Sequence, residues 1–150
     1  MGALKYDMIK TSPEKVIVFD WDRALSLQGN TGPYIQYTYA RASSILRKAK
    51  KSRPQAFDAS MLTDREEIGL LRMLLCFKDF LSSSARDLRP HHMANYAYDL
   101  ATRFNEFYER LPVLKTEEKV LNARLALTLS VMIVLKNSLH LLGIDAPEKM

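Results

Sequence analysis

The sequence predicts an all-α fold, a helical bundle of four or five main helices that follows a short irregular N-terminal segment. Apolar residues recur at helical spacing through most of the chain after residue 34. Capping residues, prolines and glycines bound these periodic segments. No segment repeats, and no linker rich in Gly or Ser divides the chain. We therefore expect a connecting segment with a glycine turn at residues 1–33 and a helical domain at residues 34–150.

The N-terminal segment contains short elements. Residues 3–11 read as a helix that ends at Ser12-Pro13. Residues 16–19, Val-Ile-Val-Phe, are the one stretch that reads as a strand, and it is short. The sequence Asp-Trp-Asp at residues 20–22 then caps a turn through residues 23–25.

The glycine turn, Gly-Asn-Thr-Gly-Pro-Tyr at residues 29–34, leads into a helix predicted for residues 34–51. Its glycines permit positive φ angles or a close backbone approach, and Pro33 sets φ for the first helical turn. A loop that leads into a helix in this way presents backbone amides that can bind phosphate. An N-cap turn without a ligand explains the same pattern, so the turn alone leaves both interpretations open.

Three further helices have clear boundary signals. The capping-box pattern Thr-Asp-Arg-Glu at residues 63–66 opens the first. Arg89-Pro90 starts the second, and Leu111-Pro112 ends it. The third opens at residues 116–118, and Gly143 closes it.

The apolar side of each helix predicts the core. In the first of these helices that side consists of Ile68, Leu71, Leu74 and Leu75. In the second it consists of Met93, Tyr96, Ala97, Leu100, Phe104, Phe107 and Tyr108. The last helix is so apolar over residues 120–142 that we place it at the centre of the bundle, with Met132 and Ile133 in the core. Cys76 is expected to be inert core as well.

The composition excludes several classes of protein. With one cysteine among 150 residues, the chain has no disulfide framework and no Cys-rich metal site, and a reducing, cytoplasmic setting is expected. Adjacent residues His91 and His92 should point to different sides of a helix, so we expect no metal site there. No apolar run reaches about 18 residues and the N-terminus has no signal-peptide pattern, so neither membrane insertion nor secretion is indicated.

Positive charge gathers in one part of the chain. The net charge is +5, which fits an anionic partner or simply a soluble surface. Residues 47–53 read Arg-Lys-Ala-Lys-Lys-Ser-Arg, and Arg41 precedes them on the same predicted helix. A solvated helix end explains this run as well as a nucleic-acid contact does. Aromatic stacking and phosphate contacts work together, so nucleic acid is favoured by the upstream tyrosines Tyr34, Tyr37 and Tyr39.

Several motifs, in the same order, resemble one known family. Residues 19–45 include Phe-Asp-Trp-Asp, Gly-Asn-Thr-Gly-Pro-Tyr and Ala-Arg, which resemble the segment after the catalytic domain in class I arginyl-tRNA synthetases. Residues 96–150 include Phe-Asn-Glu-Phe-Tyr, Arg-Leu-Ala-Leu and a terminal Pro-Glu-Lys-Met, which resemble that family's helical anticodon-binding domain of the DALR type. Lys149 replaces the family's usual arginine. By this resemblance, residues 1–33 are the end of the connection to the catalytic domain.

The resemblance implies recognition of the anticodon loop of arginine tRNA during ATP-dependent arginyl-tRNA aminoacylation. In the family the glycine-turn loop and the extreme C-terminus lie near the anticodon, which carries over to Asn30, Tyr34 and Met150. Tyr34 is the expected stacking residue, Asn30 the partner for a base edge, and Met150 a thioether contact. Tyr37 either joins them or faces the bundle. The side chains expected to contact phosphates are Arg41, Arg47, Lys48, Lys50 and Lys51.

The family's catalytic signatures are absent from the sequence. It has neither a His-Ile-Gly-His-like motif nor a Lys-Met-Ser-Lys-like loop, and its one Lys-Met pair is Lys149-Met150. We therefore expect no catalysis and no cofactor in this chain alone. ATP and arginine would bind the catalytic domain of the parent synthetase, which is also an expected partner. The chain would be an excised part of that enzyme or a natural stand-alone relative.

Two other classes of function make different predictions. A helical protein-interaction module descended from the same domain would show no preference for RNA, and exposed apolar patches near residues 52–62 would support it. A complete small enzyme would need a nucleotide site, which the sequence does not show.

Overall fold

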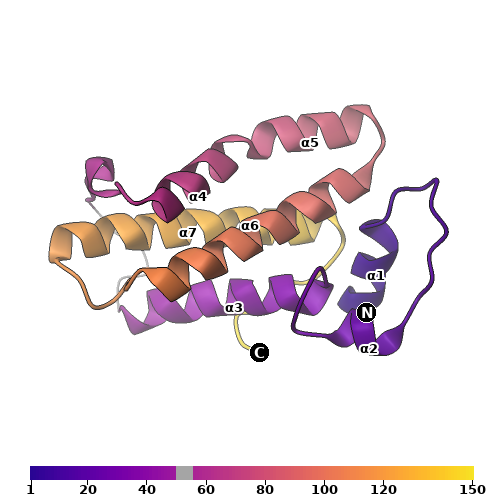
Figure 1. Ribbon diagram of the computed structural model, residues 1–150, viewed down its shortest axis with the longest axis horizontal. Coiled ribbons are helices and arrows are strands. Elements are labelled where there is room, and N and C mark those ends of the chain that lie inside the picture. The colour runs from indigo at the N-terminus through magenta and orange to yellow at the C-terminus, as the bar shows by residue number, and fades with distance from the viewer. Residues whose placement is uncertain (50–55) are drawn as a thin grey trace.

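The structure, a computed structural model, describes residues 1–49 and 56–150, and every regular element in those ranges is helical (Figure 1). Five longer helices form the bundle: α3 (Gly32–Lys48), α4 (Arg65–Leu75), α5 (Phe77–Arg86), α6 (Pro90–Arg110) and α7 (Glu118–Leu141). The shorter elements are α1 (Gly2–Ile9), α2 (Trp21–Leu25) and the 3₁₀ turn η1 (Ala59–Met61). The predicted all-α bundle of four or five main helices is confirmed.

Helices α6 and α7 run through the middle of the bundle (Figure 1). Helix α3 packs against both on one side, and α4 packs against both on the other, with α5 continuing along α6. Helices α1 and α2 pack against α3 at the end where α3 begins. The largest fully buried side chains of the bundle helices include Tyr39, Tyr96, Leu100, Phe104, Phe107, Leu125 and Leu135. Among the helices that the structure describes, none is long and apolar enough to span a membrane.

Caps and prolines fix several helix starts where the sequence predicts them. Asp20 caps α2, because its side chain accepts a hydrogen bond from the Arg23 backbone N–H at 2.9 Å. Asp64 and Glu67 form a capping box at the start of α4, one residue later than the predicted pair of Thr63 and Glu66, because Asp64 and not Thr63 is the N-cap. Pro90 occupies the first turn of α6, where its missing N–H has no intrahelical partner to lose.

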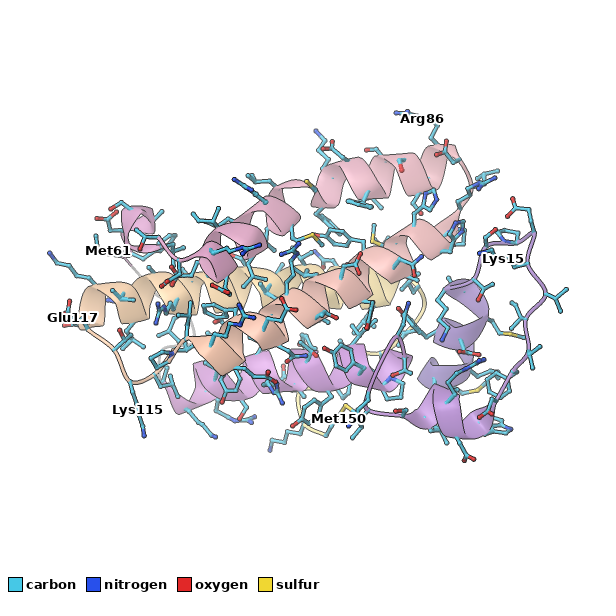
Figure 2. The ribbon with its side chains drawn as sticks, viewed as in Figure 1. Lys15, Met61, Arg86, Lys115, Glu117 and Met150 are labelled. Atoms are coloured by element: carbon cyan, nitrogen blue, oxygen red, sulfur yellow. The ribbon has the colours of Figure 1, made fainter. Side chains whose placement is uncertain are left out.

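The end of α7 turns the chain back across α3. Gly143 has a φ of +66°, and the N–H groups of Gly143 and Ile144 bond to carbonyl oxygens in the last turn of α7, as in a Schellman motif. Gln36 Nε2 on α3 then donates to the carbonyl oxygen of Asp145 at 2.7 Å. Residues 144–150, which we call the C-terminal tail, therefore lie against α3, and Met150 lies beside the lower edge of that helix in Figure 2.

The strand expected at residues 16–19 is wrong. Residues 16–20 have no regular secondary structure, and Val16 and Val18 are 91% and 74% exposed. A strand needs a neighbouring strand for its backbone N–H and C=O groups. The described part of the chain offers none, so the local preference of Val and Ile for extended structure produces only an extended loop.

Two residues expected in the core at the end of α4 lie on the surface. Leu75 is 80% exposed, and Cys76 is exposed as well. The reason is that α4 ends at Leu75, and the chain passes through Cys76 into the separate helix α5. Leu70, which is fully buried, holds the inner position of α4.

Two further core predictions, on α6 and α7, are also wrong. Ile133 is 48% exposed, because the fully buried Val131 and Leu135 on either side of it face the core and so turn Ile133 outward. Tyr108 is 40% exposed and lies near the end of α6. The other predicted core residues of α6 are buried.

Arg124, part of the Arg-Leu-Ala-Leu motif, forms ion pairs and a hydrogen bond inside the bundle. Its Nε lies 2.6 Å from Glu67 Oε1 and its Nη2 lies 3.2 Å from Asp64 Oδ2. Its Nη1 donates to the Pro112 carbonyl oxygen at 2.9 Å. Glu67 is fully buried, and a buried carboxylate needs such a partner. The arginine therefore joins α7 to the start of α4 and to the loop after α6.

Candidate nucleic-acid interface

A groove lies where the C-terminal half of α3, the end of α6 and the C-terminal tail meet. Its volume is about 540 Å³. Four cationic side chains line it, Arg41, Arg47, Lys48 and Lys149, against one carboxylate side chain, Glu148. The remaining lining residues are Tyr37, Ala40, Ser44, Ile45, Tyr108, Leu114 and Met150. The groove is therefore positively charged and carries two tyrosine rings.

Helix α3 supplies one wall of the groove through its periodicity. Tyr37, Arg41, Ser44 and Lys48 follow one another at intervals of three or four residues, which places them on one face of the helix. Arg47 and Lys48 are exposed in the last turn of α3, where positive charge also complements the helix dipole. Their charge therefore stabilises the helix end and faces the groove at the same time.

Arg41 is held between the two tyrosine rings. Its guanidinium carbon lies 4.9 Å from the centroid of the Tyr37 ring and 5.3 Å from that of the Tyr108 ring. Its Nη1 donates to Oδ1 of Asn105 at 2.7 Å. These are cation–π distances, and together with the hydrogen bond they restrict the guanidinium to a narrow range of positions.

The C-terminal tail supplies the opposite wall. Lys149 is exposed and Met150 is 62% exposed, so the ammonium group and the thioether are both accessible. The tail lies close to α3, because Gln36 binds the Asp145 carbonyl oxygen and the last three residues line the groove. Burial raises the pKa of the Tyr39 hydroxyl, and the nearby negative charge of Glu148 raises it further. The tail thus forms a fixed side of the groove.

The structure brings together five of the predicted site residues. Tyr37, Arg41, Arg47, Lys48 and Met150 all line the groove. Tyr37, for which the sequence left two orientations open, is 38% exposed and faces the groove. The predicted Lys50 and Lys51 lie outside the described residues.

Tyr108 and Lys149 also line the groove and were absent from the predicted site. Tyr108 stands one helical turn after the buried Phe104, so periodicity assigned it to the core. Its phenol hydroxyl was the available signal, since Tyr places an apolar ring and a polar tip at the boundary between core and solvent. The one sequence signal for Lys149 as a groove residue is its position next to Met150.

Asn30 and Tyr34 do not line the groove and are engaged elsewhere. Asn30 Oδ1 lies 2.6 Å from the Tyr6 hydroxyl, and its Nδ2 lies 3.3 Å from Oδ1 of Asn95. The Tyr34 hydroxyl accepts a hydrogen bond from Asn105 Nδ2 at 3.0 Å. Its half-buried ring packs at a tilt against a neighbouring tyrosine of α6. Both predicted contacts with a base stay untested.

The glycine turn has a structural explanation. The Thr31 hydroxyl caps α3 by accepting from the Tyr34 backbone N–H at 3.2 Å, and it donates to the Ser26 carbonyl oxygen at 2.6 Å. A Cβ at Gly32 would lie 3.0 Å from Tyr6 Cβ and 3.2 Å from the Gly2 carbonyl oxygen, closer than ordinary van der Waals contact, so α1 would have to shift to admit a side chain. The turn therefore caps α3, and the second glycine lets α1 approach α3 closely.

No group of three or more side chains of the metal-binding kind comes together within residues 1–49 and 56–150. His91 and His92 do not diverge as expected: their ring centroids lie 4.4 Å apart, edge to face, in the first turn of α6.

Comparison with known proteins agrees with these features. Residues 35–150 match the family model described as the DALR anticodon binding domain. The chain is 44% identical to the arginine–tRNA ligase of Thermococcus kodakarensis and 46% identical to that of Methanosarcina barkeri. All of this chain is covered in both comparisons, against 24% and 27% of the two relatives. The chain thus spans about a quarter of their length.

Solved structures give the same result. The arginyl-tRNA synthetase of Thermus thermophilus superposes with a TM-score of 0.93 at 42% identity, over 99% of this chain and 26% of that one. The arginyl-tRNA synthetase from Plasmodium falciparum superposes with a TM-score of 0.84 at 31% identity, again over 99% and 26%. Because the matching family model spans most of the sequence, the chain belongs to the DALR anticodon-binding domain family.

Proposed function

We propose that this chain is the anticodon-binding part of an arginine–tRNA ligase and that the groove holds the anticodon loop of arginine tRNA. One observation carries the proposal: the groove combines four cationic side chains with two half-exposed tyrosine rings. The likeness to arginine–tRNA ligases over the whole chain supports the choice of tRNA.

The chemistry of the groove suits unpaired nucleotides. Bases in a loop are splayed out and can stack on aromatic rings, which contributes about 1–3 kcal/mol for each base. Tyr37 and Tyr108 offer such rings, and the Met150 thioether offers a polarizable apolar contact beside them. The side chains of Arg47, Lys48 and Lys149 would contact phosphates, which contributes affinity without reading the base sequence.

The parent enzyme's catalytic domain is the second partner in this proposal. Several apolar side chains of the N-terminal segment are more than half exposed to solvent. They are Val16, Val18, Trp21, Leu25 and Leu27. Apolar side chains exposed to this degree within one short segment favour an interaction site there. We place the catalytic domain against it, with ATP and arginine bound there, and the reaction in the cytoplasm.

A protein-interaction module is less well supported by the structure. Within residues 56–62, Phe57 is 53% exposed, whereas Leu62 is buried. One exposed ring does not form a patch. The exposed apolar side chains of the N-terminal segment are far from Phe57 in the sequence, and they fit a contact with the catalytic domain.

Binding of a fluorescent anticodon stem-loop of arginine tRNA tests the proposal. The wild type should bind it more tightly than a stem-loop with altered anticodon bases, and affinity should fall as the salt concentration rises. Tyr37→Ala should weaken binding by about 1–3 kcal/mol. Tyr98→Ala, which removes a half-buried tyrosine outside the groove, serves as the matched control.

The charges are tested in the same assay. The plot of log affinity against log salt has a negative slope. In a variant with Arg47→Gln and Lys48→Gln, the magnitude of this slope should be smaller by about two. Arg86→Gln removes an exposed arginine at the end of α5, far from Met150 in Figure 2, and should leave the slope unchanged. If the groove variants bind like the wild type and the controls, the proposed site is wrong.

A further inference from the structure

Asn105 is a buried amide directly behind the groove. It lies on α6 and is 7% exposed. Its Oδ1 accepts from Arg41 Nη1 at 2.7 Å, while its Nδ2 donates to the Tyr34 hydroxyl at 3.0 Å and to Thr38 Oγ1 at 2.9 Å. Both amide hydrogens and the amide oxygen are therefore engaged with side chains of α3.

The network determines which end of the amide faces Arg41. The Thr38 hydroxyl donates its one hydrogen to the Tyr34 carbonyl oxygen at 2.9 Å. Thr38 Oγ1 can therefore only accept from Asn105, so the NH₂ group must face Thr38. The oxygen of Asn105 then faces Arg41, and this assignment follows from the hydrogen bonds alone.

A neutral amide orients the guanidinium without cancelling its charge. A carboxylate in the same position would pair with Arg41 and offset the positive charge of the groove. Among the residues that the structure describes, the partners of Arg41 are the Asn105 amide and the two tyrosines, and no carboxylate is among them. Arg41 is therefore held in place and keeps its full charge for a ligand.

We propose that Asn105 is a positioning residue for RNA binding, which holds Arg41 in the orientation in which Arg41 contacts the RNA. This inference rests on the proposed function of the groove. An arginine ordered before binding loses less side-chain entropy when the complex forms. Asn105→Ala should thus weaken binding of the arginine anticodon stem-loop by about 2- to 12-fold.

A double-mutant cycle between Asn105→Ala and Arg41→Ala tests the proposal. If Asn105 acts through Arg41, its substitution should have no further effect on affinity once Arg41 is absent. The matched control is Thr38→Val, which removes the hydrogen bond from Asn105 Nδ2 to Thr38 Oγ1 and leaves the bond to Arg41. This control should lower the Tm while its affinity stays within about 2-fold of the wild type.

Asn105→Asp supplies a second measurement. The aspartate keeps an oxygen for Arg41 and adds a negative charge, so the slope of log affinity against log salt should fall by about one. Asn105→Ala keeps the charge of Arg41, so its slope should match the wild type. Because any carboxylate beside Arg41 offsets its charge, an unchanged slope in Asn105→Asp would show that the charge of Arg41 takes no part in binding.

The outcomes separate this inference from the proposed function. If Arg41→Ala binds the stem-loop as tightly as the wild type, the groove is not the binding site and the proposed function is wrong. If Arg41→Ala weakens binding but Asn105→Ala acts equally in both backgrounds, only the positioning role is overturned. Where thermal melting shows that Asn105→Ala does not fold, the same cycle between Asn105→Ser and Arg41→Ala decides.

Discussion

The two ends of α3 use similar residue types for different purposes. At the start of the helix, Asn30, Thr31 and Tyr34 form hydrogen bonds within the protein, and Gly32 lies against α1. From Tyr37 to the C-terminal end of the helix, Tyr37 and the cationic side chains face an open groove. The first end holds the N-terminal segment to the bundle, and the second has side chains free to meet a ligand.

The more conspicuous of the two sequence motifs is not the one with more exposed polar groups. Glycine and proline at residues 29–34 stand out because the backbone there must turn, cap a helix and let two helices approach. Those demands occupy the polar groups of the turn. The groove draws on common residues at helical spacing, so it is less visible in the sequence although more of its polar groups are exposed.

The largest expected effect concerns the helix junction. Tyr6 on α1 is fully buried and lies against the start of α3, so Tyr6→Ala should lower the free energy of unfolding by about 3–5 kcal/mol. The affinity of the folded fraction for the stem-loop should not change. Urea unfolding and anisotropy check the two quantities. A specific loss of affinity at full folding would contradict the separation of the two ends.

The next largest effect concerns the groove. Tyr108→Ala should weaken stem-loop binding by about 1–3 kcal/mol, because it removes a stacking surface and one ring beside Arg41. The neighbouring Phe107, which is fully buried, is the matched control. Phe107→Ala should lower stability instead, by about 3–5 kcal/mol. Equal loss of affinity in both variants would show that Tyr108 acts through folding.

A smaller effect is expected from the cap of α3. Thr31→Ala removes a hydrogen bond to the first helical turn and another to Ser26, which should lower the free energy of unfolding by about 0.5–2 kcal/mol. Thr31→Ser keeps the hydroxyl and should restore most of it. Both variants should bind the stem-loop like the wild type. Thermal melts and titrations distinguish this result from a phosphate-binding role of the turn.

The smallest effect is expected for Asn30. Asn30→Ala loses contacts with Tyr6 and Asn95, which should reduce stability by about 0.5–1.5 kcal/mol. Binding to the arginine stem-loop and to one with an altered anticodon should keep the same ratio. If that ratio falls, Asn30 reads a base edge, and the comparison between the two ends of α3 fails.

Local signals in the sequence predicted most of the fold. Pro33, Pro90 and Gly143 act within one helical turn, so their effects can be read without knowing the neighbouring elements. Residues 16–19 show the limit of such signals, because a strand depends on a partner that the described part of the chain lacks. The break at Cys76 carries no proline or glycine, so no local signal announced it.

The site was predicted only in part for a related reason. Tyr37, Arg41, Arg47 and Lys48 share one helix face, which periodicity can indicate. Tyr108 and the tail reach the same groove from other parts of the chain, and only tertiary packing brings them there. The hydrogen bond of the Tyr34 hydroxyl could not be predicted for the same reason, because its partner, Asn105, lies on α6.

The glycine at the end of α7 also sets the register of the tail. Because Gly143 turns the chain just before the tail and Gln36 binds Asp145, the number of residues after Asp145 determines which side chain lies in the groove with Arg41. One residue inserted after Asp145 would shift Lys149 and Met150 relative to α3 while the helices stay in place. The length of the tail, and not only its sequence, therefore determines which side chains line the groove.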